Sequence, residues 1–325
     1  MKKISVSVPA STANLGAGFD CLALALDLRS TVEFWEIGSG LEVEVEGEAE
    51  GRLPLDATNL IVRAADKVFE KIKRRPPGLH VRAVNVIPLS SGLGSSAAAI
   101  VGGLVAANAL VGGDLSRHDL LQLAYEMEGH ADNAAAVLFG GLALVSAHPG
   151  ELVTCRLATP PLKVVIALPG VHLSTAQARA ALPALVPLKD AVFNIGHALL
   201  TAQALAAGDF ELLRQAVDDH LHQPYRQPLI PGCAAAVAEA RLAGAVAVTL
   251  SGAGPSLAAF APPAARHAAI AEAMKVAFET CGLACRTFIV PVDPHGARLE
   301  GNAETTGQTT TATNSSIRQE LFREA

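Results

Sequence analysis

Aromatic and basic residues are both scarce in this sequence. Aromatic side chains make up 4% of the 325 residues, which argues against a platform on which nucleic-acid bases could stack. The 25 basic residues are outnumbered by 31 acidic ones, and the net charge of −6 provides no global field that would hold a polyanion. We therefore expect no nucleic-acid partner, and any anionic ligand must be bound by local groups.

Long hydrophobic runs are also missing. Residues 4–8 alternate like a strand and end at Pro9, without the roughly 7–15-residue apolar core of a signal peptide. The most apolar segment, residues 97–111, contains Gly102, Gly103 and Asn108 and is too short to span a bilayer. The sequence therefore predicts no membrane partner and a cytoplasmic location.

Cysteine is present in an odd number and in no metal-binding pattern. Cys281 and Cys285 lie four positions apart, but no cluster of histidine or cysteine accompanies them. We expect all five cysteines to be ordinary thiols of a protein in a reducing compartment.

The remaining composition is that of a globular protein with a large core. Half of the residues are apolar and 17% are charged, and the length predicts about two domains at roughly 150 residues each. Hydrophobic periodicity predicts strands at residues 4–8, 31–37, 41–46, 80–87, 142–146, 152–157, 163–168, 245–250, 257–260 and 285–290, and helices at 59–73, 96–110, 118–127, 189–207, 210–220, 234–242 and 264–280.

Strands and helices mixed in this order indicate two α+β domains, which we assign to residues 1–158 and 159–292. Residues 293–325 are rich in Thr, Asn, Ser and Glu and poor in apolar side chains. Such a segment cannot bury enough surface to order itself, which predicts a disordered, dispensable tail.

The strongest local signal is the run PLSSGLGSSA at residues 88–97, between a predicted strand and a predicted helix. Glycines let backbone N–H groups approach an anion, and a helix N-terminus adds partial positive charge. Ser95 and Ser96 could cap the helix or offer a hydroxyl to phosphate or Mg²⁺. The alternative is a tight turn before an ordinary N-capped helix. A Walker loop is excluded because the Gly-Lys pair is missing, and a dinucleotide fingerprint because Ala97 stands at its third glycine.

The whole run resembles the phosphate-binding motif of the GHMP small-molecule kinases. Two further segments fit that resemblance, PASTANLGAGFD at residues 9–20 and SGAGPS at residues 251–256. The resemblance implies an N-terminal ribosomal-S5-like α/β domain that binds ATP and a C-terminal ferredoxin-like α+β domain. It also implies ATP contacts at Asn59, Pro88, Leu89, Ser90, Ser91, Gly92, Leu93, Gly94, Ser95, Ser96, Ala97, Gly252, Ala253 and Gly254, although Asn59 could simply be the N-cap of its helix.

Within that family the chain is most similar to the homoserine kinases. The segment EGHADN at residues 128–133 matches them except that Ala131 replaces the usual proline, and residues 175–183 and 222–226 also resemble them. The resemblance covers roughly residues 3–292 and implies Mg²⁺- and ATP-dependent phosphorylation of L-homoserine for threonine biosynthesis. Another GHMP kinase, such as one acting on mevalonate, and a GHMP-fold metabolite sensor without turnover are the alternatives. Whether the chain forms a homodimer is left open.

Homoserine is a zwitterion that carries a primary alcohol, and this suggests roles for four residues. Its carboxylate calls for the fork-shaped donors that Arg179 and Arg226 could supply. Its ammonium group needs oxygen ligands such as those of Asp20 and Asn14. The alternatives are a weak surface ion pair for either arginine and a turn position for Asp20.

The resemblance also implies the residues nearest to phosphoryl transfer. Mg²⁺ would be held by Ser96 and Glu128, with Glu126 as the alternative carboxylate. Because a dissociative transition state needs no strong base, we expect Asn133 to orient the hydroxyl and Thr175 to contact phosphate. Asp132 is a further candidate for the catalytic group.

Overall fold

The protein contains two sheets, each covered by helices, in a computed structural model that describes residues 3–148 and 151–300. The first sheet consists of β1 (Lys3–Ala13), β2 (Leu22–Ile37), β3 (Gly40–Gly47), β4 (Gly78–Asn85), β5 (Leu142–His148), β6 (Glu151–Leu157) and β11 (Arg298–Glu300). Its strand order is β11-β1-β2-β4-β3, and β5 pairs with both β2 and β6. The β3–β4 pair is parallel, as expected for strands joined by a helical crossover.

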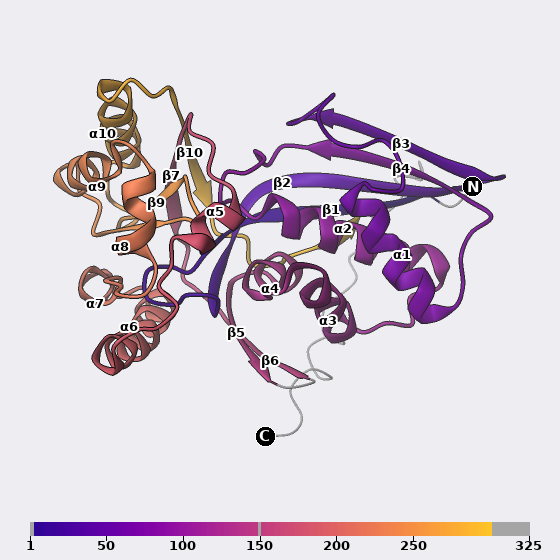
Figure 1. Cartoon of the computed structure of the whole chain (residues 1–325), viewed down its shortest axis with the longest axis horizontal. Coiled ribbons are helices and arrows are strands. Elements are labelled where there is room, and N and C mark those ends of the chain that lie inside the picture. Colours follow the sequence, from indigo (N-terminus) through magenta and orange to yellow (C-terminus); the bar gives the residue numbers. More distant parts are fainter. Residues whose placement is uncertain (1–2, 149–150, 301–325) are drawn as a thin grey trace, which may run out of the picture.

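Four helices cover one face of this sheet: α1 (Leu60–Ile72), α2 (Ser95–Val111), α3 (Arg117–Glu128) and α4 (Asp132–Phe139) (Figure 1). Helix α2 is central, and its small residues allow close packing. A Cβ atom on Gly102 would lie 2.7 Å from Val32 on β2, and one on Gly103 would lie 2.5 Å from the carbonyl oxygen of Ile61 on α1. The glycines therefore let the middle of α2 pack closely against the sheet and against α1.

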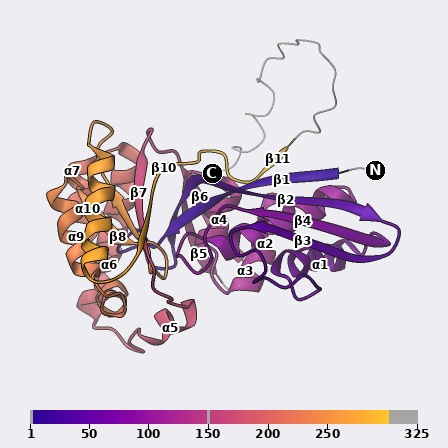
Figure 2. The ribbon, with the colours of Figure 1, turned by 90° about the horizontal axis from the view of Figure 1, so that it is seen from above.

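The second sheet contains β7 (Lys163–Pro169), β8 (Ala247–Leu250), β9 (Leu257–Phe260) and β10 (Cys285–Pro291), in the antiparallel order β10-β7-β9-β8. Figure 2 shows this sheet between the first sheet and the helices α9 (Cys233–Leu242) and α10 (His267–Thr280). The other helices here are α5 (Thr175–Ala180), α6 (Leu188–Ala207), α7 (Phe210–Ala216) and α8 (Gln223–Arg226), which runs into a 3₁₀ turn at Gln227–Leu229.

Both halves share apolar contacts. The larger buried cluster joins side chains of β1, β2 and α2 to Val164, Ile166 and Phe260 of the second sheet, whereas the smaller one lies between that sheet and α9–α10. The two-part α+β architecture predicted from the sequence is confirmed. The chain leaves the first sheet at Leu157 and enters the second at Lys163, on either side of the predicted boundary.

The prediction of a disordered tail from residue 293 is wrong for residues 293–300. Asp293 is 1% exposed, receives a hydrogen bond from Arg29 and accepts two more from the backbone N–H groups of His295 (2.8 Å) and Gly296 (2.7 Å). Strand β11 then pairs with β1. The polar composition led to a wrong prediction because these polar groups form hydrogen bonds within the protein. The rest of the predicted tail, residues 301–325, lies outside the described residues.

Candidate active site

A cavity of about 430 Å³ collects most of the predicted site residues. It is formed by the loop after β1, the segment entering α2, the end of α3, the start of α5 and the loop between β8 and β9. The predicted residues that line it are Asn14, Asp20, Ser90, Ser91, Gly92, Gly94, Ser95, Ser96, Ala97, Glu128, Asp132, Asn133, Thr175, Arg179, Arg226, Gly252, Ala253 and Gly254.

Five candidates do not line this cavity: Asn59, Pro88, Leu89, Leu93 and Glu126. Asn59 is the N-cap of α1, where its side chain accepts a hydrogen bond from the N–H of Ile61 (2.9 Å) and donates one to the carbonyl of Pro54 (2.7 Å). This is the alternative that the sequence left open, and the ATP contact of Asn59 stays a prediction. Glu126 is exposed on α3 and receives a hydrogen bond from Gln122, which favours Glu128 as the metal-binding carboxylate.

Three loops far apart in the sequence are joined by hydrogen bonds. The N–H of Ser11 donates to the carbonyl of Leu93 (3.0 Å), and the N–H of Gly252 donates to the carbonyl of Ala13 (3.0 Å). The hydroxyl of Ser251 donates to the carbonyl of Gly92 (2.7 Å). The three glycine-containing motifs therefore form one connected wall of the cavity.

Two glycines in this wall are required by close contacts and by backbone conformation. Gly92 has φ +78° and a Cβ atom on it would lie 2.2 Å from the carbonyl oxygen of Ser251; Gly94 has φ +71° and its Cβ would lie 2.0 Å from the hydroxyl of Ser11. Both backbones occupy the left-handed region that favours glycine. Only glycine at these two positions lets the run approach Ser251 and Ser11 this closely.

The N-terminus of α2 opens onto the cavity without a side-chain cap. The N-cap is Gly94, which has no side chain to offer, and Ser95 and Ser96 are the first two helical residues. The prediction that either serine caps the helix is therefore wrong, because the cap position falls one residue earlier. The first N–H groups of a helix lack intrahelical acceptors, so this end remains available to an anion.

Asp20 and Arg179, both predicted to bind the acceptor, are paired with each other. The two carboxylate oxygens of Asp20 accept bonds from Nη1 and Nη2 of Arg179, each at 2.9 Å, and both side chains are partly exposed. Asn14 connects Asp20 to the loop between β8 and β9: its Nδ2 donates to the carbonyl of Gly252 (2.7 Å) and its Oδ1 accepts the N–H of Asp20 (3.0 Å).

Arg226 is a deeply buried charged group in the cavity wall, at 2% exposure. Its Nε donates to the carbonyl of Ala178 (3.2 Å) and its Nη1 contacts the carbonyl of Gly252 (3.4 Å). No described residue accepts a hydrogen bond from its Nη2. Burial, followed by the nearby charge of Arg179, lowers the pKa of Arg226, so an anion between the two guanidinium groups would be stabilised.

Glu128 carries a carboxylate whose Oε2 is buried and has no hydrogen-bond partner among the described residues. Burial raises the pKa of Glu128, while the hydroxyl of Ser96 and the charge of His130 act in the opposite direction. The hydroxyl of Ser96 and the carboxylate of Glu128 are oxygen ligands that lie together, and Mg²⁺ commonly takes only one or two ligands from the protein. Among the described residues, no group of three or more His, Cys, Asp or Glu could hold a metal.

Asn133 and Asp132 begin α4, and Asn133 lies beside Ser11 and Gly94. Oδ1 of Asn133 accepts the hydroxyl of Ser11 (2.9 Å), and Oδ1 of Asp132 accepts the N–H of Asn133 (2.8 Å). His130 contacts the same Asp132 oxygen at 3.2 Å, and this hydrogen bond is the main cause that raises the pKa of His130. Thr175 is exposed at the first position of α5, after the N-cap Ser174.

Some residues of the site were missed by the sequence analysis. Ser11 fixes the amide of Asn133, and His130 lines the cavity beside Asp132. Both residues lie inside the motifs quoted above, so their membership of a motif could have identified them as site residues. The buried Asp219 lies outside those motifs; it accepts hydrogen bonds from the N–H groups of His222 (3.0 Å) and Gln223 (2.6 Å) and from Asn194 (2.7 Å), and so holds the start of α8.

Comparisons with known proteins agree with this geometry. The family models described as the N-terminal and C-terminal domains of GHMP kinases match residues 59–141 and 201–280. The chain is 47% identical to the homoserine kinase of Moorella thermoacetica, over 90% of this chain and 98% of that protein, and 43% identical to that of Microchaete diplosiphon, over 91% and 97%.

Solved structures show the same likeness. A homoserine kinase from Cytophaga hutchinsonii superposes with a TM-score of 0.85 at 32% identity and covers 92% of this chain and 98% of that one. The L. major mevalonate kinase in complex with R-mevalonate shares the fold at 19% identity, with a TM-score of 0.64 and coverages of 91% and 97%. Among the residues that the structure describes, no helix is both long and apolar enough to cross a membrane.

Proposed function

The chain belongs to the GHMP kinase family, and from this premise we propose that it transfers the γ-phosphoryl group of ATP to the hydroxyl of L-homoserine. The product is O-phospho-L-homoserine, a precursor in threonine biosynthesis. The relatives named homoserine kinase support this acceptor. The observation that carries the proposal is that an uncapped helix N-terminus and two neighbouring guanidinium groups share one cavity.

We assign the phosphates of ATP to the wall formed by residues 90–97 and 252–254. The N–H groups at the start of α2 and the positive end of its dipole favour a polyanion there. The interlocked loops support this assignment because donors that are already fixed need little reorganisation in the transition state.

Mg²⁺ would be held by Ser96 and Glu128. The buried, unpartnered oxygen of Glu128 supports this role. When bound, the ion supplies charge stabilisation to the phosphates. Burial otherwise disfavours the ionised carboxylate, so a cation and Glu128 stabilise each other.

The acceptor lies at the arginine end of the cavity. Its carboxylate would bind Arg226 and Arg179, and its ammonium would bind Asp20 and Asn14. In the free protein Asp20 and Arg179 neutralise each other, and a zwitterion offers each of them a new partner of the right sign. An acceptor without an ammonium group would leave Asp20 without such a partner.

The acceptor hydroxyl would be oriented by Asn133. Its amide is fixed on one side by Ser11 and on the other by Asp132, to which its Nδ2 contributes a 3.3 Å contact. Oδ2 of Asp132 has no partner among the described residues, so Asp132 remains the alternative acceptor for the hydroxyl proton. Thr175 would contact the transferred phosphate from the start of α5.

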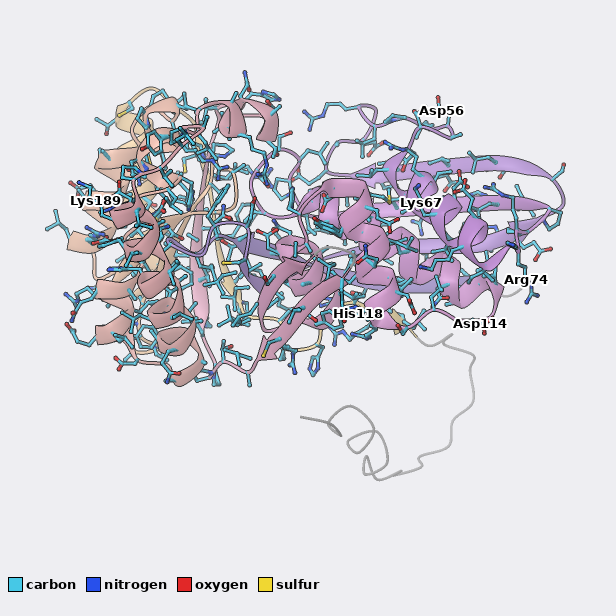
Figure 3. All side chains as sticks on the ribbon, turned by 60° about the horizontal axis from the view of Figure 1, so that its bottom comes forward. Asp56, Lys67, Arg74, Asp114, His118 and Lys189 are labelled. Atoms are coloured by element: carbon cyan, nitrogen blue, oxygen red, sulfur yellow. The ribbon has the colours of Figure 1, made fainter. Side chains whose placement is uncertain are left out.

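We place the enzyme in the cytoplasm and propose that it pairs with a second copy of itself. All five cysteines are unpaired, which supports a reducing compartment. Leu188, Val192, Ile195 and Leu199 of α6 are each at least 60% exposed, and their spacing of four, three and four residues is that of a coiled-coil seam. Lys189, at the start of this helix, lies at the opposite end of the molecule from Arg74 and Asp114 (Figure 3).

An assay of ADP release across four acceptors tests the proposed function. With Mg²⁺ and ATP present, L-homoserine should support turnover far above mevalonate, galactose and shikimate. Turnover with one of the other acceptors would identify a different GHMP kinase. Binding of ATP without turnover on any of the four would instead favour a metabolite sensor.

A further inference from the structure

Phe19 lies behind the arginine end of the cavity and contacts three groups around it. Its ring centroid is 5.1 Å from the guanidinium carbon of Arg226 and 5.7 Å from that of Arg179. The ring of His222 stacks on it at 5.2 Å, with 26° between the planes. Phe19 itself does not line the cavity, so it can influence a bound ligand only through these neighbours.

Nearby carboxylates offset the mutual repulsion of the two arginines only in part: burial and the charge of Arg179 lower the pKa of Arg226 overall, although Asp20, Asp219 and Asp132 raise it. Arg179 pairs with Asp20, but Arg226 has no carboxylate partner among the described residues and bonds only to carbonyl oxygens and to His222. Burial and the charge of Arg179 both lower the pKa of Arg226, which means that its charged form is less favourable than that of an exposed arginine. A ring face within about 6 Å attracts a guanidinium electrostatically and leaves its N–H donors free for a ligand.

His222 completes the arrangement from the other side. Its Nε2 lies 2.7 Å from the carbonyl oxygen of Gly16, which can only accept, so Nε2 carries the hydrogen. Burial is the main cause that lowers the pKa of His222 and favours the neutral ring. Nδ1 is then a bare acceptor, and Nη1 of Arg226 lies 3.4 Å from it.

We propose that Phe19 is a positioning residue that sets the gap between Arg179 and Arg226 and thereby the affinity for the carboxylate of the acceptor. His222 holds one edge of Arg226 in the same arrangement. The inference rests on the proposed function, because it assumes that the acceptor carries a carboxylate between the two guanidinium groups.

The test compares Phe19→Leu, Phe19→Met and Phe19→Tyr by steady-state kinetics in both substrates. Leu and Met remove the ring but keep an apolar side chain, and we expect each to raise the homoserine KM about 5- to 30-fold while the ATP KM stays within two-fold. Tyr keeps the ring and should restore a homoserine KM close to the parent value. The Met variant decides the outcome if the Leu variant does not fold.

Phe288→Leu is the matched control. Phe288 lies on β10, with the guanidinium of Arg286 at 5.2 Å from its ring centroid, a pair of the same geometry outside the cavity. Its loss should leave both KM values unchanged.

The inference is overturned if Phe19→Leu and Phe19→Met bind homoserine as the parent does, or if the homoserine and ATP KM values rise together, as a general packing defect would cause. A parent enzyme inactive with homoserine would overturn the proposed function. The two failures are distinguishable because one appears in the parent protein and the other only in the ratio of variant to parent.

Discussion

At the scale of single residues, some polar side chains of the cavity have their hydrogen-bond partners within the protein, whereas others have a donor or acceptor left for a ligand. Asn14 and Asn133 use their amide groups to join loops. Oε2 of Glu128 and Nη2 of Arg226, in contrast, have no partner among the described residues. Substitutions in the second group should therefore change ligand affinity most directly.

Glu128→Gln should weaken the response to Mg²⁺. We expect the MgCl₂ concentration for half-maximal turnover to rise more than about ten-fold, measured at fixed ATP. Burial holds the folded-state pKa of Glu128 above its unfolded value, so its ionised form lowers stability at neutral pH. Gln should therefore keep or raise the melting temperature in metal-free buffer.

Ser96→Ala should shift the Mg²⁺ response in the same direction. Glu126→Gln is the control for Glu128→Gln because Glu126 is exposed on the same helix, two positions away. Equal shifts in Glu126→Gln and Glu128→Gln, or no shift in the latter, would remove Glu128 from the metal site.

Arg226→Ala should raise the homoserine KM by more than about 30-fold and change the ATP KM far less, since a buried guanidinium facing a carboxylate would be lost. Steady-state kinetics and a melting curve measure the two effects separately. Arg241→Ala, an exposed arginine in the last turn of α9, is the control. If the substitution only lowers the melting temperature, Arg226 is a packing residue.

The sequence motifs predicted which residues line the site, but they did not predict which of these residues contact one another. Residues 88–97 and 252–254 were predicted as two separate loops, and most of the first and all of the second line the cavity. The bond between Ser11 and Asn133 was not foreseeable because it joins residues 122 positions apart. The same applies to the Asp20–Arg179 pair, in which two predicted ligand-binding residues bind each other.

At the scale of elements, hydrophobic periodicity placed most helices and strands within a few residues of their ends. The predicted helix at 59–73 is α1 (Leu60–Ile72), and the strand at 41–46 is β3 (Gly40–Gly47), whose glutamates lie on its exposed side. Short elements were missed, among them α5 and α8, because four to six residues carry too little periodicity. β11 was missed because its stability depends on β1 and Asp293 rather than on apolar side chains of its own.

Two truncations separate the contribution of residues 293–300 from that of residues 301–325. Deleting residues 301–325 should leave activity and the melting temperature unchanged, since that stretch has few apolar residues. Deleting 293–325 removes Asp293 and leaves Arg29 without its carboxylate partner, which should cost about 3–5 kcal/mol.

Differential scanning calorimetry of the two truncated proteins measures this difference. The longer deletion should melt more than about 5 °C lower. Equal melting temperatures would mean that β11 and Asp293 contribute nothing to stability.

At the scale of the whole molecule, the two-part α+β architecture and the family were predictable from sequence, whereas surfaces were not. The periodicity of α6 predicted a helix, but only the structure revealed that its row of large apolar side chains is exposed. Apolar spacing in a sequence cannot distinguish a face that packs inside its own chain from a face that packs on another chain.

Sedimentation velocity tests the proposed pairing through α6. The parent protein should sediment as twice its chain mass of 33.4 kDa, and Ile195→Asp, in the middle of the row, should sediment as a monomer. Leu242→Asp is the matched control, because Leu242 is of the same size as Ile195 and more exposed but lies at the end of α9. A monomeric parent protein at micromolar concentration would exclude the pairing.

The interlocked loops also have a consequence for synthesis on the ribosome. Asn14 and Gly252, which are joined by a hydrogen bond, are 238 positions apart, so a growing polypeptide cannot close this cavity until most of its length has emerged. A ligand that binds in the cavity, as we propose for ATP, would therefore stabilise finished molecules by mass action but not incomplete chains.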